Sequence, residues 1–226
     1  MNSMHRYEIK FVLNDIQLSD VDSWISSKTS MLPKFDPRIV NSLYMDDIGF
    51  SSVKDNLSGI SNRKKYRLRW YGLIPETFNP VFEIKGRNNR VGFKETYPIS
   101  SLHGTIHKMN INQIIRKCSN DLLSKNYFFD TPIIPSLQVK YLRSYFQDNE
   151  GIRLTLDKDI SFSIPTLYGQ IQGNAEVKYP PKILEIKFEP NAKDKVVELI
   201  SSLHIRPKRH SKYLAGLASL GMAQYI

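Results

Sequence analysis

Three strand-like segments of the sequence contain Glu-Ile-Lys between apolar or aromatic residues. They are YEIKF (residues 7–11), FEIKG (82–86) and LEIKF (184–188). In an extended strand successive side chains alternate between faces, so each Glu and Lys share one face and the apolar residues share the other. Carboxylates are ligands for Mg²⁺ or Mn²⁺, and cationic side chains bind phosphate oxygens. The charged faces could therefore serve phosphoryl-transfer chemistry.

Other segments with the same alternation add cations to these faces. In YRLRWYG (66–72), Arg67 and Arg69 alternate with apolar residues, and in GIRLTLDKD (151–159) Arg153, Thr155 and Asp157 do so. Like charges repel strongly where water is excluded, and Arg can hold a phosphate group through two parallel hydrogen bonds, so a phosphate chain would suit the surplus of cations. The alternative is a solvated sheet face with ordinary cross-strand Glu–Lys pairs. The cations are Lys10, Arg67, Arg69, Lys85, Arg153 and Lys187, joined by Lys94 and Arg143, and the main acids are Glu8, Glu83 and Glu185.

The composition indicates the general class of protein but does not identify its ligand. The 226 residues include 32 Lys+Arg against 22 Asp+Glu, a net charge of +10. This balance favours an anionic partner such as nucleic acid, an acidic membrane surface or a phosphorylated small molecule. The single Cys118 excludes an intrachain disulfide and a Cys-rich zinc site, and its helical stripe predicts burial. Because no segment approaches the roughly 18 apolar residues of a membrane span, we expect a cytoplasmic protein.

Period-two and helical patterns predict one α+β domain over residues 1–226. Helices are expected at 18–31, 110–125, 191–203 and 210–223, the first with Ser19 as its N-cap. If the antiparallel sheet closes into a barrel, one face of each strand points into a shared basic tunnel and the helices cover the apolar outside. Strands are expected at 6–11, 41–47, 66–72, 81–87, 91–99, 137–146, 151–159 and 183–189.

These segments resemble a known family when they are taken together and in order. YEIKF, YMDD, KYRLRWYG, FEIKGR, RSYF followed by GIRLTLDKDI, ILEIKF and HSKY occur in the order and spacing of the polyphosphate polymerase domain of the vacuolar transporter chaperone (VTC) family. That family belongs to the triphosphate tunnel metalloenzymes. The resemblance runs from about residue 5 to residue 215. It implies an antiparallel eight-stranded β-barrel tunnel, with helices packed on the outside, that holds a triphosphate or polyphosphate chain.

The resemblance also implies roles for individual residues. Glu185 and Glu8 would bind the metal, and Tyr44 and Asp46 match positions that we interpret as mainly structural. Catalytic roles fall on Lys10, Arg67, Arg69, Lys85, Arg153 and Glu185. The implied phosphate ligands are Lys10, Arg67, Arg69, Lys85, Lys94, Arg143, Arg153, Lys187, Ser211 and Lys212.

By similarity, the reaction would transfer the γ-phosphoryl group of ATP onto a growing polyphosphate chain with the help of Mn²⁺ or Mg²⁺. A general base is not essential, because the attacking phosphate oxygen is already ionised at neutral pH. One departure concerns the metal: the broader superfamily has two glutamates before the lysine of the first strand, and Arg6 stands where the first of them would fall. The sequence does not indicate a protein partner.

Three other functions fit parts of the sequence. The same fold can hydrolyse tripolyphosphate or a nucleoside triphosphate, or it can bind a polyanion without catalysis. Nucleic-acid binding is disfavoured because most aromatic residues alternate with the charges and so face the core instead of forming a stacking platform. The YMDD segment at residues 44–47 also occurs in reverse transcriptases, but nothing else in the sequence supports a polymerase palm domain.

Overall fold

The computed structural model describes residues 7–73, 79–88, 91–104, 106–171 and 174–223. Short 3₁₀ helices occupy Ser100–Leu102, Ile106–Lys108 and Pro190–Ala192. The strands are β1 (Tyr7–Leu13), β2 (Leu32–Asp46), β3 (Arg63–Tyr71), β4 (Val81–Asn88), β5 (Val91–Pro98), β6 (Ile134–Gln147), β7 (Arg153–Ser163), β8 (Val177–Tyr179) and β9 (Lys182–Phe188). The α-helices are α1 (Asp15–Lys28), α2 (Ser51–Leu57), α3 (Ile111–Leu123), α4 (Lys193–Ser201) and α5 (Lys212–Ser219).

The strands pair in the order β1-β9-β7-β6-β2-β3-β4-β5, and β8 pairs with β7 outside this path. The pairs β1–β9, β7–β9, β2–β3, β3–β4 and β4–β5 are antiparallel. The predicted α+β class with an antiparallel eight-stranded path is therefore confirmed. No helix in the described part of the chain is long and apolar enough to cross a membrane.

The chain divides into two compact units. The first contains Met1–Arg38, Tyr141–Ile160 and Lys178–Ser211, and the second contains Ile39–Lys140, Ser161–Val177 and Lys212–Ile226. Strands β2, β6, β7 and β8 pass from one unit to the other. The expectation of one domain over residues 1–226 stays a prediction.

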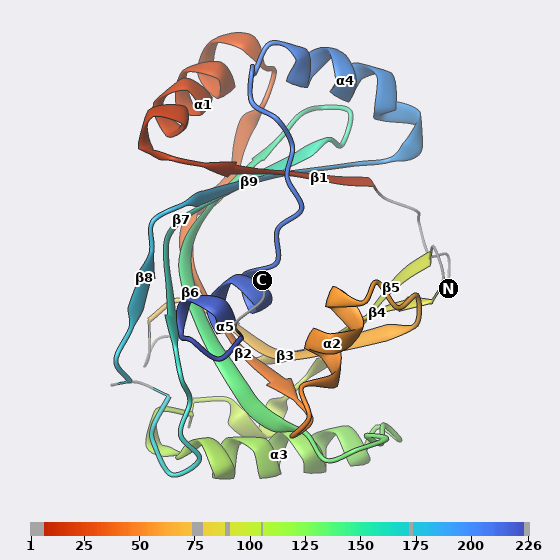
Figure 1. The fold of residues 1–226 in the computed structure, drawn as a ribbon, viewed down its shortest axis with the longest axis vertical. Coiled ribbons are helices and arrows are strands. Elements are labelled where there is room, and N and C mark those ends of the chain that lie inside the picture. The colour runs from red at the N-terminus through yellow and green to blue at the C-terminus, as the bar shows by residue number, and fades with distance from the viewer. Residues whose placement is uncertain (1–6, 74–78, 89–90, 105, 172–173, 224–226) are drawn as a thin grey trace. The chain divides into compact units, whose positions relative to one another are not determined.

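In the first unit, helices α1 and α4 lie side by side over the apolar face of β1 and β9 (Figure 1). Phe11 and Leu184 from the strands share a buried cluster with Trp24 of α1 and Val196 of α4. The indole of Trp24 donates a hydrogen bond to Ser202 Oγ at 3.0 Å, which satisfies its polar atom at the edge of the cluster. These helices cover the apolar face, as the sequence predicted.

The start of α1 differs from the prediction that Ser19 is its N-cap. The N-cap is Asn14, whose side chain accepts from the Gln17 backbone N–H at 2.8 Å, while the Gln17 side chain accepts from the Asn14 N–H at 3.1 Å. This reciprocal capping box satisfies two backbone donors of the first turn, so the helix begins one turn earlier. Ser19 lies inside the helix.

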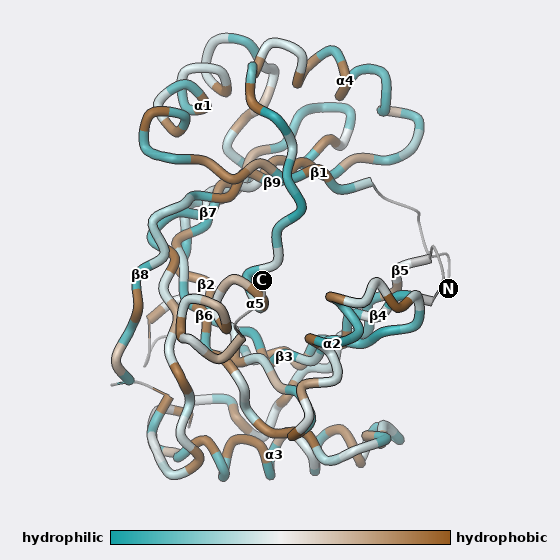
Figure 2. The backbone as a smooth tube through the Cα atoms, in the orientation of Figure 1, coloured by the Kyte–Doolittle hydropathy of each residue, from teal (hydrophilic) through white to brown (hydrophobic). Residues whose placement is uncertain are grey.

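In the second unit, α3 packs on the apolar face of the sheet. Ile114 and Cys118 of this helix share a buried cluster with Leu68, Trp70 and Phe82 of β3 and β4. Figure 2 shows α3 alternating between hydrophobic and hydrophilic residues along its length, as an amphipathic helix requires. The predicted burial of the Cys118 thiol is confirmed, and burial raises its pKa.

Helix α5 lies on the opposite face of the second unit's sheet. Its Tyr213 ring stacks on Tyr44, a β2 residue that lies directly opposite Arg67 in the strand pairing. At Gly216 an added Cβ would fall 2.5 Å from Leu137 Cδ2 and 2.8 Å from the Phe162 ring, so the helix approaches the strands closely. This helix therefore packs on the charged face, whereas α1, α3 and α4 pack on the apolar one.

Candidate phosphate-binding site

In the second unit, a row of polar side chains crosses the sheet on one face. The strand pairing places Tyr44 opposite Arg67, Arg67 opposite Glu83 and Glu83 opposite Thr96. Arg69 lies two positions after Arg67 on the same face of β3, because side chains alternate along a strand. We call Arg67, Arg69, Glu83 and Lys94 the β3–β5 cluster.

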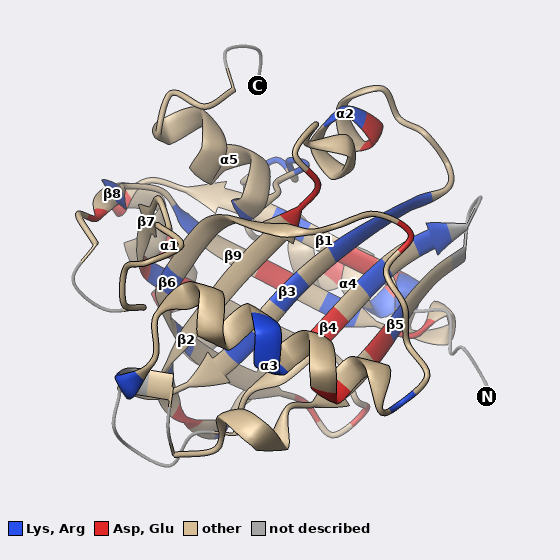
Figure 3. Ribbon diagram, turned by 90° about the horizontal axis from the view of Figure 1, so that it is seen from below, with Lys and Arg blue, Asp and Glu red and all other residues tan. Residues whose placement is uncertain are grey.

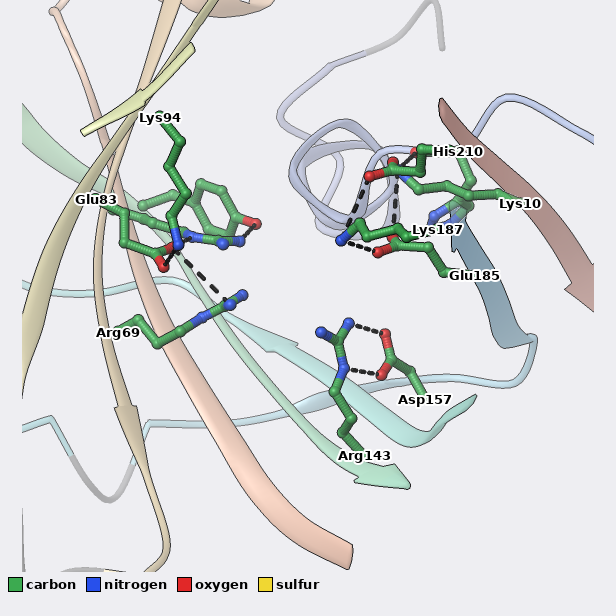
Figure 4. A network of polar contacts seen from close by, with 12 residues as sticks. Lys10, Arg69, Glu83, Lys94, Arg143, Asp157, Glu185, Lys187 and His210 are labelled. Carbon is green, nitrogen blue, oxygen red and sulfur yellow. Dashed lines mark hydrogen bonds and ion pairs between the residues drawn. The ribbon is translucent and has the colours of Figure 1, made fainter. Parts of the chain in front are cut away.

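Glu83 is the centre of the β3–β5 cluster. Its carboxylate is buried and ion-paired to Arg67, and Lys94 Nζ lies 2.5 Å from its Oε1. Arg69 Nη1 lies 3.9 Å from Glu83 Oε2, so three cations surround one carboxylate (Figure 4). The carboxylate thus holds the cations in place on this face.

The pKa of Glu83 reflects the same arrangement. Burial alone would raise this pKa, but the positive charges of Arg67 and Arg69 and the hydrogen bond from Lys94 lower it to about 2. The net shift is downward because the cations outweigh the cost of burying the charged form. Glu83 is therefore ionised at neutral pH.

Lysines form a second row beside the β3–β5 cluster. Lys65 lies directly opposite Lys85, and Lys85 lies opposite Lys94. Like charges that face one another across strands are destabilising unless an anion offsets them. Bands of Lys and Arg mark β3 in Figure 3, and Glu83 is the single carboxylate among the described residues on this face of β3, β4 and β5.

The α5 helix is fixed to this face by a buried hydrogen-bond network. The Tyr213 hydroxyl donates to Asp46 Oδ2 at 2.8 Å and lies 3.0 Å from Ser136 Oγ. Asp46 Oδ1 accepts from the backbone N–H groups of Asp47 and Ser52, at 3.0 and 3.1 Å, which ties the start of α2 to the same carboxylate. Sequence reasoning interpreted Asp46 as structural, and these contacts are consistent with that interpretation.

In the first unit, charged side chains pair across β1 and β9. Glu8 lies opposite Lys187, and Lys10 lies opposite Glu185. On the next strand, Arg153 of β7 lies opposite Lys187. We call Glu8, Lys10, Glu185 and Lys187 the β1–β9 cluster.

The two carboxylates of the β1–β9 cluster share the same two lysines. Lys10 Nζ lies 2.6 Å from Glu8 Oε1 and 3.7 Å from Glu185 Oε2, while Lys187 lies 3.5 Å from Glu8 Oε2 and is ion-paired to Glu185 (Figure 4). Burial raises the pKa of Glu185, but Lys187, Lys10 and Arg143 lower it more strongly. The pKa of Glu8 is lowered as well, by Lys10 and Lys187 against burial and the charge of Glu185. Both groups are therefore ionised at neutral pH.

Arg143 has a partner that sequence reasoning missed. Its Nε donates to Asp157 Oδ1 at 2.5 Å and its Nη2 donates to Oδ2 at 2.8 Å, a bidentate pair with a fully buried carboxylate. The pKa of Arg143 is raised because Tyr141 and Asp157 oppose the effect of burial. Alternation along β7 placed Asp157 on the charged face, but sequence spacing could not assign it to Arg143.

Two pockets open beside the β1–β9 cluster. One, of ≈ 230 Å³, is lined by Arg153, Lys187 and Glu189 together with Gln147, Gly151 and Phe188. The other, of ≈ 370 Å³, is lined by Glu8, Ile9, Lys10, Pro207, Lys208, Arg209 and His210.

The second pocket is closed on one side by the segment that leads into α5. Lys208 N donates to Lys10 O at 2.8 Å, and Lys10 Nζ donates to His210 O at 3.3 Å. The His210 ring lies 3.2 Å from the Tyr179 hydroxyl, and Figure 2 shows this segment as hydrophilic. Basic side chains are thus brought to the edge of β1 by backbone contacts.

Glu8 and Glu185 fit the donor set that a divalent cation needs. They are neighbouring ionised carboxylates on paired strands, and Mg²⁺ in proteins commonly binds through one or two carboxylates plus substrate phosphates. Within the described residues, no three or more His, Cys, Asp or Glu side chains come together as a metal site. A cation bound here would take its other ligands from water or from a bound phosphate compound.

The VTC domain profile matches residues 5–221, so the chain belongs to the VTC domain family, and the family identified from the sequence is confirmed. No relative was found among curated proteins.

Two solved structures with the same fold cover nearly the whole chain. The PH1819 protein from Pyrococcus horikoshii OT3 has a TM-score of 0.54 at 14% identity, over 96% of this chain and 99% of that chain. HpAC1 from Hippeastrum, described as an adenylyl cyclase candidate with a dominant triphosphatase activity, has a TM-score of 0.53 at 14% identity, over 95% and 96%. At this identity the likeness shows the fold alone.

The structure divides the predicted ligands between the two units. Arg6, where the sequence departs from the superfamily pattern, lies outside the described residues. Lys10, Arg143, Arg153, Lys187, Ser211, Glu8 and Glu185 belong to the first unit, and Arg67, Arg69, Lys85, Lys94 and Lys212 belong to the second. Their roles as phosphate or metal ligands stay predictions.

Proposed function

We propose that this protein is a polyphosphate polymerase that transfers the γ-phosphoryl group of ATP onto a polyphosphate chain. The observation that carries the proposal is the VTC domain match over residues 5–221. The β3–β5 and β1–β9 clusters support it, because each joins several cations to few carboxylates and so suits a polyanion.

In the proposed reaction, a terminal phosphate oxygen of the chain attacks the γ-phosphorus of ATP. A new phosphoanhydride bond forms, the bond between the β- and γ-phosphates breaks, and ADP leaves. Arg67, Arg69 and Lys85 on one unit, and Lys10, Arg143, Arg153 and Lys187 on the other, would bind phosphate oxygens and neutralise their charge. Phosphoryl transfer depends mainly on such positioning and charge stabilisation, so the proposal needs no covalent intermediate on the protein.

Glu185 and Glu8 would hold Mn²⁺ or Mg²⁺. When bound, such a cation neutralises phosphate charge and helps to orient the transferring group. Lys10 and Lys187 hold both carboxylates in the ionised form, which is the form that binds a cation.

Hydrolysis of tripolyphosphate or a nucleoside triphosphate is the second candidate function. The observation that favours it is the shared fold with HpAC1, to which a dominant triphosphatase activity is ascribed. Water would replace the phosphate acceptor, and the same cationic side chains would serve.

Incubation of the purified protein with γ-labelled ATP and Mn²⁺, followed by separation of the products by size, tests the proposal. We expect a ladder of long, nuclease-resistant polymer that disappears in Glu185→Gln. Labelled orthophosphate as the sole product would indicate the hydrolase, and unchanged ATP together with tight polyphosphate binding would indicate a non-catalytic module.

A further inference from the structure

Tyr44 occupies a fixed position on the charged face of the second unit. The side chain is 9% exposed, and its ring stacks on Tyr213 with centroids 5.0 Å apart and an interplanar angle of 12°. The Arg67 guanidinium carbon lies 6.0 Å from the ring centroid. A phenol packed in this way cannot turn its hydroxyl elsewhere without disturbing α5.

Within the described residues, the Tyr44 hydroxyl takes part in one hydrogen bond, in which it is the acceptor. The oxygen accepts from Arg67 Nη1 at 3.3 Å. The hydroxyl hydrogen therefore remains to be donated. A buried donor without an acceptor is costly, so the geometry calls for an acceptor from outside the protein.

The charges around Tyr44 identify the chemistry of that acceptor. Burial raises the pKa of the Tyr44 phenol, but the positive charges of Arg67, Arg69 and Lys212 lower it by more. The net shift of this pKa is therefore downward. Three cations thus act on one neutral donor, an environment that favours an anion whose oxygens only accept hydrogen bonds. The phosphate group has this chemistry.

We propose that Tyr44 is a further phosphate-binding residue, whose hydroxyl donates a hydrogen bond to a phosphate oxygen neutralised by Arg67 and Lys212. The inference rests on the proposed function and deepens it. It also changes the interpretation of Tyr44, which the sequence placed among mainly structural residues. Helix α5 then has two tasks, since it brings Lys212 to this face and holds the Tyr44 ring through Tyr213.

The two stacked phenols, Tyr44 and Tyr213, differ in how their hydroxyl hydrogens are used. The Tyr213 hydroxyl donates to Asp46 Oδ2 at 2.8 Å, so its hydrogen is already used inside the protein. Removal of the Tyr213 hydroxyl should lower stability, whereas removal of the Tyr44 hydroxyl should chiefly lower affinity for phosphate.

The first test compares Tyr44→Phe with wild type in calorimetric titrations with tripolyphosphate at matched ionic strength. We expect binding about tenfold weaker or more, the range for a hydrogen bond to a charged group, and an unchanged melting temperature without ligand. Tyr97→Phe is the matched control, because its hydroxyl bonds Glu95 on the other face of β5, and its affinity should equal that of wild type. Equal affinity of Tyr44→Phe and wild type would overturn the proposal.

A double-mutant cycle with Arg67→Ala separates direct donation from an effect through Arg67. If Tyr44 itself contacts the phosphate, Tyr44→Phe weakens binding further in the Arg67→Ala background. If it only positions Arg67, the second substitution has no effect there, and the proposal is wrong. Arg67→Gln replaces Arg67→Ala if circular dichroism shows that the alanine variant does not fold.

The outcome is separable from that of the polymerase proposal. Failure to make polymer from ATP, combined with tripolyphosphate binding that depends on Tyr44, would contradict the polymerase and leave the Tyr44 site in place. If the protein makes polymer from ATP but binds tripolyphosphate equally well with Tyr44→Phe, the polymerase proposal is supported and the Tyr44 site is contradicted.

Discussion

Glu83 lies directly opposite Arg67 across β3 and β4, and its buried carboxylate contacts Arg67 and Lys94 at the same time. This arrangement holds the cationic side chains in place before any ligand arrives. A preorganised site loses less entropy when it binds, which favours affinity for a chain of phosphates. The same arrangement makes the stability of the protein sensitive to any change at Glu83.

Glu83→Gln should destabilise the ligand-free protein by about 3–5 kcal/mol, because it leaves buried Arg67 and Arg69 without their carboxylate. Saturating tripolyphosphate should restore part of this loss, so the ligand-induced rise in melting temperature should exceed that of wild type. Thermal unfolding with and without the ligand checks both effects. Glu95→Gln on the opposite face of β5 is the control, and an equal ligand response in Glu83→Gln and wild type would contradict the account.

Glu83 should also contribute to the acid sensitivity of the fold. Its pKa falls from 4.5 to about 2 on folding, so its stabilising contribution is fully present above pH 4.5 and is lost as the pH falls toward 2. The lost contribution is about 3 kcal/mol. Urea unfolding between pH 7 and pH 2 measures it, and Glu83→Gln should show a correspondingly smaller loss over this range. An identical pH profile for the variant would show that Glu83 is not the group responsible.

Arg143→Ala should destabilise the protein by about 3–5 kcal/mol, because Asp157 is completely buried and would lose its bidentate partner. The double variant Arg143→Ala with Asp157→Asn removes the buried negative charge that Arg143 neutralised and should recover much of this loss. Chemical denaturation of the two variants provides the comparison. If the double variant is no more stable than the single one, the buried charge is not the cause.

Gly216→Val should loosen α5 from the sheet, since even a Cβ at this position would fall within 3 Å of Leu137 and Phe162. Overpacking of this kind costs about 1–3 kcal/mol. Because α5 carries Lys212, affinity for tripolyphosphate should fall along with the melting temperature. Gly104→Ala, which has no atoms near its Cβ position but a positive φ, tests for a general backbone effect and should leave the affinity unchanged.

The alternating strands and the helix α3 were predictable because they have a simple period. Other elements lacked such a signal. The first part of β2 contains Pro33 and Pro37 and no clear alternation, although the strand begins at Leu32. The seven-residue α2 follows Phe50 in the left-handed conformation (φ 54°), and its first backbone N–H groups donate to Asp47 and Asp46 instead of to the N-cap side chain. An N-terminus of this kind lacks the usual N-cap residue that a sequence pattern would reveal.

For the candidate site, the sequence could predict which side chains share a strand face but not which of them meet. Alternation placed Glu83 and Arg67 on charged faces, yet their pairing depends on the register of β3 and β4. The partner of Arg143 and the use of Tyr44 depend in the same way on contacts between strands and on the placement of α5. The family resemblance predicted the roles of individual residues, and the structure shows which side chains contact one another.

The central claim is that these cationic strand faces bind polyphosphate, and a thermal unfolding titration with tripolyphosphate tests it most directly. At 100 times its dissociation constant the ligand should add about 2.7 kcal/mol of stability. For a protein of this size that is a rise in melting temperature of roughly 5–10 °C. The rise should shrink in Arg67→Ala and in Arg153→Ala, and it should persist in Lys28→Ala on the exposed surface of α1. A rise no larger than that produced by sodium chloride at the same ionic strength would contradict the account.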